Sequence, residues 1–363
     1  MGRRSRGWSL ALALGCVNAS CGGYRPDPAP RSAPKLSPAP VVGTPFTAMW
    51  VAHGPAQVTP PLVLVDSSLY LAGGGRQVVK MDIRGGAVIW SRRLGGPIAG
   101  GVLYREGRVY AASDQPEGKV RAWTEIAGND IWSEGTGPVT APLAFVDTLL
   151  IVRARSGETM GLDRVTGTIK WRSHTSAGLA PAIPGVPTET IIPALDTLYR
   201  LDTGSGHIRQ RVPAPGPLIY PLIAQDSVAL GVTADGVLFR VRLADLQVDW
   251  RLPTHAVPAG PPLMLGDTMV IVSRIGRFYE IRAGDPGPLR EFADSAAPVT
   301  MGPVRIGDDF VVGGADGAVS ARDHEGKEVW RFVIRRPIEV APVVTPYGLV
   351  FVGGDGEIHL FRQ

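Results

Sequence analysis

The sequence predicts an all-β fold, an eight-bladed β-propeller of four-stranded antiparallel blades, because three landmarks recur about every 40 residues. Tryptophans, prolines and acidic turn residues each form a series, and the three series agree on one period. A period of this length with several short strands per unit is typical of a propeller. The repeat therefore outweighs the chain length, which alone would suggest two or three domains for 363 residues.

The tryptophan series sets the number of blades. Successive members are 40, 42, 39, 79 and 80 residues apart, so each double gap has room for one degraded copy, near Gln210 and near Phe292. This makes eight positions. A tryptophan packed between blades stabilises the fold by several kcal/mol through the area that it buries, which explains the repeat without any ligand. The predicted docking residues are Trp50, Trp90, Trp132, Trp171, Trp250 and Trp330.

A tight turn precedes most of these tryptophans. In the stretch from Asp163 to Trp171, Asp and Thr favour a turn by bonding their own backbone, and Gly supplies the positive φ that a strand reversal needs. The Asp stands eight residues before the landmark, and the Gly stands four residues before it. The predicted turn residues are Asp82, Gly86, Gly128, Asp163, Gly167, Asp202, Gly206 and Gly326.

The other two landmarks mark the first two strands of each unit. A proline begins a short apolar run in most units, and an acidic turn follows it by about five residues, before a β-branched strand. The prolines are Pro61, Pro142, Pro181, Pro221, Pro262, Pro303 and Pro342. The acidic residues are Asp66, Glu106, Asp147, Asp226, Asp267 and Asp308.

The two ends of the repeat region complete each other. After Trp330 the chain supplies only three strands, whereas Phe46–Trp50 is a tryptophan strand without a blade of its own. We therefore expect residues 46–52 to pair beside residues 356–361. This closes the ring and leaves no large unpaired edge.

Two segments precede the predicted propeller of residues 46–363. Residues 1–21 have a basic start and a short apolar run, too short to cross a bilayer, and so resemble a lipoprotein-type signal peptide. The sequence before Cys16 is a passable lipidation motif, with Cys21 as the alternative, and a plain secretory peptide is the rival interpretation. Residues 22–45 hold seven prolines and predict a disordered, extended tether.

Charge and cysteine content limit the partners and the compartment. The formal charge of +4 includes three arginines of the leader, so that a cleaved chain carries about +1 and a nucleic-acid partner is not predicted. Cysteine is absent after residue 21, which fits an oxidising compartment in which a fold of this size needs no disulfides. We expect export and lipid anchoring to the outer membrane on its periplasmic face, since neither Val17 nor Gly22 is an inner-membrane retention Asp.

No catalytic, cofactor-binding or metal-binding residue is predicted. The six histidines are scattered, and the Asp-Gly pairs recur at hairpin positions, so turns explain them better than calcium. Neither a Gly-x-Ser-x-Gly motif nor a phosphate-binding loop is present. Trp123 lies off the repeat, and two interpretations remain open: it caps the third strand of its blade, or it stands on the surface as a partner contact.

The motif Asp-x-x-Thr-Gly-x-x-x-Trp of Asp163–Trp171 resembles the repeat of the pyrroloquinoline-quinone (PQQ) propellers. The resemblance covers roughly residues 46–363, and with the leader it is most similar to the BamB family of outer-membrane assembly lipoproteins. It implies that the fourth-strand tryptophan docks on the next blade and that the repeat itself binds no quinone. The PQQ dehydrogenases carry an adjacent cysteine pair near the quinone, which this chain lacks.

The resemblance implies a non-catalytic scaffold that binds a periplasmic or outer-membrane protein partner, such as the barrel-assembly machinery. The chain is then expected to be monomeric apart from that partner. The alternative is a propeller enzyme, or a PQQ-type sensor or accessory, that binds a small molecule in the central funnel.

Overall fold

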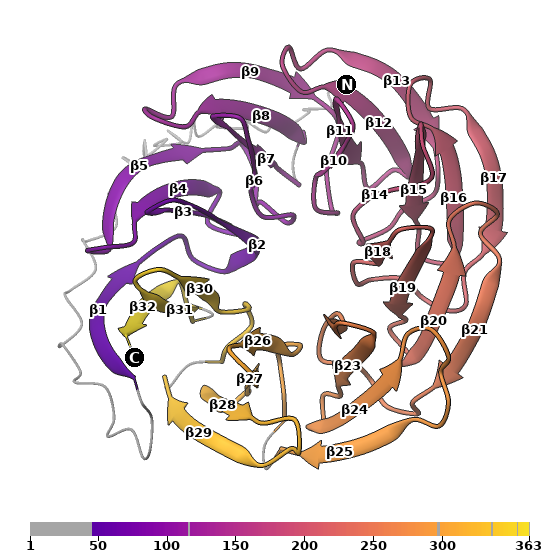
Figure 1. Cartoon of the computed structure of the whole chain (residues 1–363). Coiled ribbons are helices and arrows are strands. Elements are labelled where there is room, and N and C mark those ends of the chain that lie inside the picture. Colours follow the sequence, from indigo (N-terminus) through magenta and orange to yellow (C-terminus); the bar gives the residue numbers. More distant parts are fainter. Residues whose placement is uncertain (1–45, 115–116, 296–297, 335–336, 354, 363) are drawn as a thin grey trace, which may run out of the picture. The chain divides into compact units, whose positions relative to one another are not determined.

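The computed structural model describes residues 46–114, 117–295, 298–334, 337–353 and 355–362. The predicted leader, the tether and both lipidation candidates, Cys16 and Cys21, lie outside these residues. The described chain forms eight four-stranded antiparallel sheets, arranged around a centre as the blades of a propeller (Figure 1). The predicted fold class and the predicted number of blades are therefore confirmed.

Blades 1 to 4 each use four consecutive strands, ordered from the centre outward. They are β2 (Val58–Val65), β3 (Ser68–Gly73), β4 (Gln77–Asp82) and β5 (Ala87–Arg93); β6 (Leu103–Arg105), β7 (Arg108–Ala112), β8 (Lys119–Thr124) and β9 (Asp130–Gly135); β10 (Ala144–Val146), β11 (Leu149–Arg153), β12 (Glu158–Asp163) and β13 (Ile169–His174); β14 (Ile183–Pro184), β15 (Glu189–Pro193), β16 (Thr197–Asp202) and β17 (Ile208–Pro213).

Blades 5 to 7 repeat this order, and blade 8 takes its outermost strand from the other end of the chain. They are β18 (Ile223–Gln225), β19 (Val228–Val232), β20 (Val237–Arg242) and β21 (Val248–Pro253); β22 (Leu263–Leu265), β23 (Thr268–Val272), β24 (Arg277–Arg282) and β25 (Arg290–Asp294); β26 (Val304–Ile306), β27 (Asp309–Gly313), β28 (Ala318–Arg322) and β29 (Glu328–Val333); β30 (Val343–Thr345), β31 (Gly348–Val352), β32 (Glu357–Arg362) and β1 (Thr47–His53).

Blade 8 closes the ring. β1 pairs antiparallel with β32, from Thr47 opposite Arg362 to His53 opposite Glu357, and Figure 1 shows β1 beside the C-terminal strand. The prediction that the N-terminal strand completes the last blade is confirmed. Its hydrogen bonds cover an edge of β32 that would otherwise be open to another strand.

A β-bulge turns the outer tryptophans inward. In blade 1 the register between β4 and β5 shifts so that Lys80 lies opposite Trp90 and Met81 lies opposite Val88, which leaves Ile89 as the extra residue. Two successive side chains, Val88 and Ile89, therefore face solvent, and Trp90 is then buried. The same shift precedes the docking position in blades 2, 3, 4, 5, 7 and 8. In blade 6 it instead leaves Phe292 itself unpaired.

The apolar core lies between the blades. One cluster, for example, joins Tyr110 and Val120 of blade 2 to Leu150 and Met160 of blade 3. Each blade thus buries its faces against both neighbours, so no blade has a core of its own. Within the described residues, no helix is long and apolar enough to cross a membrane.

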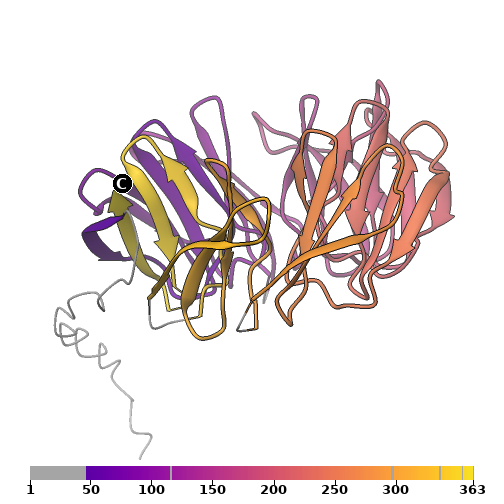
Figure 2. The same ribbon diagram turned by 60° about the horizontal axis from the view of Figure 1, so that its bottom comes forward.

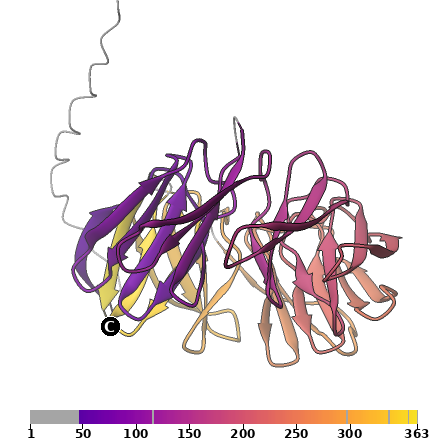
Figure 3. The same ribbon diagram turned by 90° about the horizontal axis from the view of Figure 1, so that it is seen from above.

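Side views show the connections of residues 46–362 gathered at two faces (Figures 2 and 3). Because the four strands of a blade are antiparallel, the connection to the next blade leaves from the same side as the turn between the second and third strands. We call this side the crossover face. The turns between the first and second strands and between the third and fourth strands form the opposite side, the turn face.

Candidate functional site

The tryptophans of the outer strands bind the next blade through their indole N–H. Trp171 of blade 3, for example, donates to the carbonyl oxygen of Thr203 in blade 4 at 2.8 Å. The ring packs on the turn of that blade, and the N–H is satisfied at the same time. The other bonds of this kind join Trp50 to Ile83 at 3.0 Å, Trp90 to Glu125 at 3.0 Å, Trp132 to Arg164 at 3.3 Å and Trp250 to Ala283 at 3.2 Å.

The turn glycines lie beneath these rings. Gly206 has a φ of +70°, and a β-carbon there would collide with the Trp171 ring. The position thus needs glycine both for its conformation and for the close approach of the ring. Gly86, Gly128 and Gly167 stand in the same relation to Trp50, Trp90 and Trp132. Gly326 also has a positive φ, but it packs on the backbone of Phe292 and on Ala293.

The turn aspartates hold the same loops by hydrogen bonds. Asp163 Oδ1 accepts from the backbone N–H groups of Val165 and Thr166, which lower the pKa of its carboxyl. Bonds from the Ser205 hydroxyl and backbone N–H, with a contact to Arg209, lower the pKa of Asp202 to about 2. For Asp82 the main cause of a lowered pKa is the Arg84 side chain. All three aspartates act within their own turns.

Three docking positions differ from this pattern. In blade 4, the Gln210 side-chain amide donates to the carbonyl oxygen of Asp245 at 2.7 Å, and so replaces the indole with a smaller donor. In blade 6, Phe292 has no side-chain donor and packs against Phe310 of blade 7 with the rings tilted, their centres 5.9 Å apart. Trp330 of blade 7 packs edge-on against Phe46, at 5.1 Å between ring centres.

Trp123 is fully buried, which overturns its interpretation as a surface partner contact. It lies in β8 and packs with Tyr70 and Val78 of blade 1, inside the core between blades 1 and 2. Its indole nitrogen has no hydrogen-bond partner among the described residues. Successive side chains of β8 point to opposite faces of the blade, so Ala122 packs toward blade 3 and Trp123 packs toward blade 1.

The histidines do not gather around a common point. No group of three or more His, Cys, Asp or Glu side chains that could hold a metal occurs in the described ranges. His359 has a lowered pKa. Burial of its imidazole is the main cause, and Glu357 opposes it with a smaller effect.

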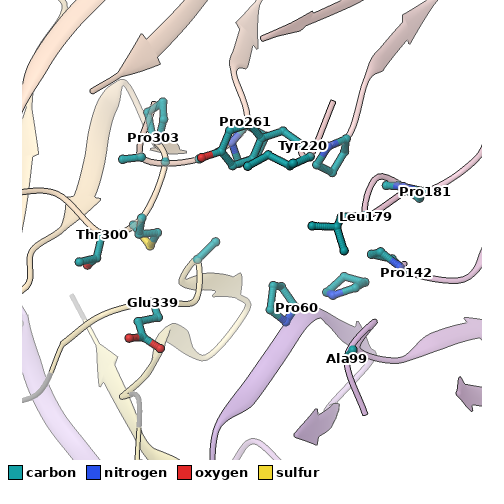
Figure 4. A pocket seen from close by; sticks show the side chains of 18 of the residues that line it. Pro60, Ala99, Pro142, Leu179, Pro181, Tyr220, Pro261, Thr300, Pro303 and Glu339 are labelled. Atoms are coloured by element: carbon teal, nitrogen blue, oxygen red, sulfur yellow. The ribbon is translucent and has the colours of Figure 1, made fainter. Parts of the chain in front are cut away.

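A cavity of about 540 Å³ lies at the centre of the ring, and all eight blades contribute to its wall (Figure 4). Five of the landmark prolines line it: Pro61, Pro142, Pro181, Pro221 and Pro303. At the other two landmarks, Pro262 and Pro342, the preceding residue lines the cavity instead, namely Pro261 and Ala341. Sequence reasoning used these prolines only to count blades. The same periodicity could have identified the cavity, because residues that begin innermost strands must meet at the centre.

Hydroxyl groups in the wall are occupied by the protein itself. Thr300 donates to the carbonyl oxygens of Ile338 at 2.6 Å and of Gly313 at 3.2 Å. The Tyr220 hydroxyl donates to Pro258 at 3.0 Å, and the Thr140 hydroxyl contacts the Gly178 carbonyl oxygen at 3.4 Å. Among the described residues of this wall, Glu339 is the one with a charged side chain, and it is exposed.

Arg153 supports one side of the wall from behind. Its side chain is 2% exposed, and its Nη1 donates to the carbonyl oxygens of Ala180 at 2.6 Å and of Pro193 at 2.7 Å. Burial lowers the pKa of the guanidinium to about 10, so it stays charged at neutral pH. These bonds hold the segment that carries Leu179, whose side chain points into the open centre in Figure 4.

Large apolar side chains are exposed on the crossover face of blades 4 to 6. Leu195 is 48% exposed and Ile275 is 63% exposed, each in the turn between the second and third strands of its blade. Leu179 and Val257, at 48% and 50%, lie in the connections that precede blades 4 and 6. Residues 213–221, which connect blade 4 to blade 5 on the same face, are rich in proline. Exposed apolar residues grouped on one face are typical of a binding surface.

Three comparisons with known proteins point to the same family. The family model described as outer membrane protein assembly factor BamB matches residues 47–117 and 116–286. BamB of Bordetella pertussis is 24% identical over 282 residues, which cover 70% of this chain and 70% of that protein. BamB from Moraxella catarrhalis superposes with a TM-score of 0.73 at 18% identity, over 88% of this chain and 100% of that chain.

Propellers of other kinds superpose almost as well. The computationally designed protein Ika8 gives a TM-score of 0.70 at 16% identity, over 86% of this chain and 98% of its own. The C-terminal WD40 domain of Sif2 gives 0.69 at 13% identity, over 88% and 98%. These structural likenesses show the fold, whereas the family model, which matches more than half of the sequence, shows the family. The chain belongs to the BamB family of outer membrane protein assembly factors.

Proposed function

We propose that this protein is a non-catalytic scaffold that binds protein partners of outer-membrane protein assembly. Its family membership supports the process. The apolar group on the crossover face supports the mode of action, and it is the observation that carries the proposal. Leu195 and Ile275 expose large side chains on short turns that are closed by backbone hydrogen bonds, so that little backbone ordering is needed when a partner covers them.

The partner proposed is a periplasmic or outer-membrane subunit of the barrel-assembly machinery. The apolar group defined by Leu179, Leu195, Val257 and Ile275 spans blades 4 to 6 on one face. A partner that covers this face would bury these side chains at the centre of the interface. The neighbouring charged residues, such as Asp196 and Arg274, would form its polar rim.

We further propose that the chain is exported and lipidated at Cys16, with Cys21 as the alternative. The signal-like residues 1–21 support export, and the proline-rich residues 22–45 supply a tether between the anchor and the propeller. Palmitate labelling of the wild type and of Cys16→Ala and Cys21→Ala decides the anchor. Absence of label in the wild type would contradict lipidation.

Cross-linked capture from envelopes tests the scaffold. The wild type is expected to recover barrel-assembly subunits reproducibly. The double variant Leu195→Asp/Ile275→Asp should recover at least about ten-fold less, because two buried carboxylates would be placed at the centre of the interface.

Ile126→Asp is the matched control. Ile126 is 83% exposed, but it lies on the turn face, between β8 and β9. This variant should retain full recovery. Equal loss in both variants would indicate a general effect on folding or solubility, and undiminished recovery in the double variant would refute the proposed surface.

A further inference from the structure

The wall of the central cavity is rich in proline, and among the described residues it carries one charged side chain. Seven of its residues are prolines, which have no backbone N–H. The hydroxyl groups of Tyr220 and Thr300 already donate to protein carbonyl oxygens. Among the described side chains of the wall, what remains for a ligand is an apolar surface and one carboxylate, that of Glu339.

Glu339 is well placed to bind a cation. It belongs to the connection that precedes β30, and its side chain is exposed at the cavity wall (Figure 4). It forms no ion pair with any of the described residues. Arg335 and Arg336, its nearest basic neighbours in the sequence, lie outside them. The nearby wall is apolar, so a charge-assisted hydrogen bond to this carboxylate would be stronger than on an open surface.

A ligand that complements this wall carries positive charge and has an apolar body. An ammonium group has three donors and no acceptor, and an alkyl chain matches the proline, leucine and isoleucine side chains of the wall. A carboxylate or phosphate ligand would be repelled by the Glu339 carboxylate. The cavity volume is within the range of small-molecule sites.

We propose that the central cavity binds the primary ammonium group of an aliphatic monoamine, with Glu339 as its counter-ion. The alkyl chain lies on the apolar wall formed by Pro60, Pro303 and Ala341, which belong to blade 8 and to the two blades next to it. One carboxylate matches one ammonium, so a second ammonium on the same chain would be left against apolar surface. The ammonium group belongs to a free amine or to a lysine side chain of a docked protein. The site does not depend on the proposed scaffold function: Leu179 lines the cavity and also belongs to the apolar group of the crossover face, but the counter-ion Glu339 does not belong to that group.

Calorimetry on the full chain with n-hexylamine, hexan-1-ol and hexanoate tests the chemistry. We expect saturable 1:1 binding of hexylamine, at least about ten-fold tighter than that of hexanol, because the charged hydrogen bond is absent from the alcohol. Hexanoate and 1,6-diaminohexane should bind more weakly than hexylamine. Equal affinity for hexylamine and hexanol, or no saturable binding of hexylamine, would overturn the proposal.

Glu339→Gln removes the charge and keeps the shape. It should weaken hexylamine binding at least about ten-fold while leaving hexanol binding unchanged. The matched control is Glu325→Gln, because Glu325 is exposed in the turn between β28 and β29, on the turn face. The control should bind within about two-fold of the wild type. Equal binding by the two variants would refute the role of Glu339.

Carbodiimide coupling, which joins a carboxylate to an adjacent amine, separates the two sources. In the presence of hexylamine, mass spectrometry should find the hexylamide at Glu339, and its absence at saturation would contradict the assigned position. The same reaction on the protein in intact envelopes distinguishes a free amine, seen as a low-mass adduct, from a lysine, seen as a cross-linked peptide of another protein.

Discussion

The outer contacts between blades and the wall of the central cavity are built from the same repeat, but they differ in how completely they are filled. At the outer contact, Trp171 is buried against Gly206, and its N–H is bonded to Thr203. At the centre, one proline or small residue from each blade faces its counterparts across an open space. Both regions are apolar, yet only the first is closed.

This difference separates stability from binding. A filled contact with a satisfied donor stabilises the ring, and removal of its side chain leaves a cavity and an unpaired carbonyl group. An exposed side chain of the wall, such as Leu179, loses little when it is truncated, because it is only partly packed. Substitutions in the outer contact should therefore lower stability, whereas substitutions in the wall should change ligand binding alone.

The largest effect is expected from deletion of the closing strand. Removal of residues 1–51 takes away most of β1 and the Trp50 ring that covers Gly86, and exposes the edge of β32. We expect the melting temperature to fall by at least about 10 °C. Deletion of residues 1–45 is the control and should change it by no more than about 2 °C. If both deletions behave alike in thermal unfolding, β1 is not needed for closure.

Trp171→Ala should have the next largest effect. It removes a buried ring and the bond to Thr203, and should destabilise by about 3–5 kcal/mol in urea unfolding. Trp171→Phe keeps part of the packing and should cost less. Leu179→Ala, in the open wall, should stay within about 0.5 kcal/mol of the wild type. A comparable loss in both alanine variants would remove the contrast between contact and wall.

Gln210→Ala tests the one docking position that uses an amide. The variant loses the 2.7 Å bond to Asp245 but little apolar packing, so we expect a destabilisation of about 1 kcal/mol. Arg211→Ala changes the adjacent exposed residue of β17 and should be close to neutral. A loss in Gln210→Ala as large as in Trp171→Ala would show that hydrogen bonding, rather than ring burial, dominates the outer contact.

The smallest effect is a pH dependence at the closing blade. His359 lies opposite Val51 of β1, and burial lowers the pKa of its imidazole below the usual 6.5, with Glu357 and Asp355 opposing and His53 adding to the shift. As the pH falls below about 6.5, the unfolded chain takes up a proton that folded His359 resists, so stability is lost toward acid pH.

His359→Gln should remove this part of the acid sensitivity. Between pH 7.5 and pH 5, the variant should lose less unfolding free energy than the wild type, as measured by urea unfolding at each pH. His174→Gln, at an exposed position of β13, should keep the wild-type slope. An unchanged slope in His359→Gln would contradict the assignment to this imidazole.

Parts of both regions could be predicted from the sequence. The spacing of the tryptophans and the three strands after Trp330 were enough to predict eight blades and their closure, because the period reflects one blade per repeat. The substitution of Gln210 at a docking position could be located, but its bond to Asp245 could not, since that carbonyl belongs to the next repeat. Trp123 showed the limit of the spacing, because only the packing of blade 2 against blade 1 decides that this ring is buried.

The sequence by itself determined the fold, the number of blades and the strand that closes the ring, because each follows from local periodicity and turn chemistry. Only the tertiary structure decided what meets at the centre and on the crossover face. Glu339, Leu179 and Pro61 are far apart in the chain, and they share one wall because the ring brings eight innermost strands together. Arg153 appears in sequence as a charge in an apolar strand, and only packing against blade 4 gives its guanidinium the carbonyl groups of Ala180 and Pro193.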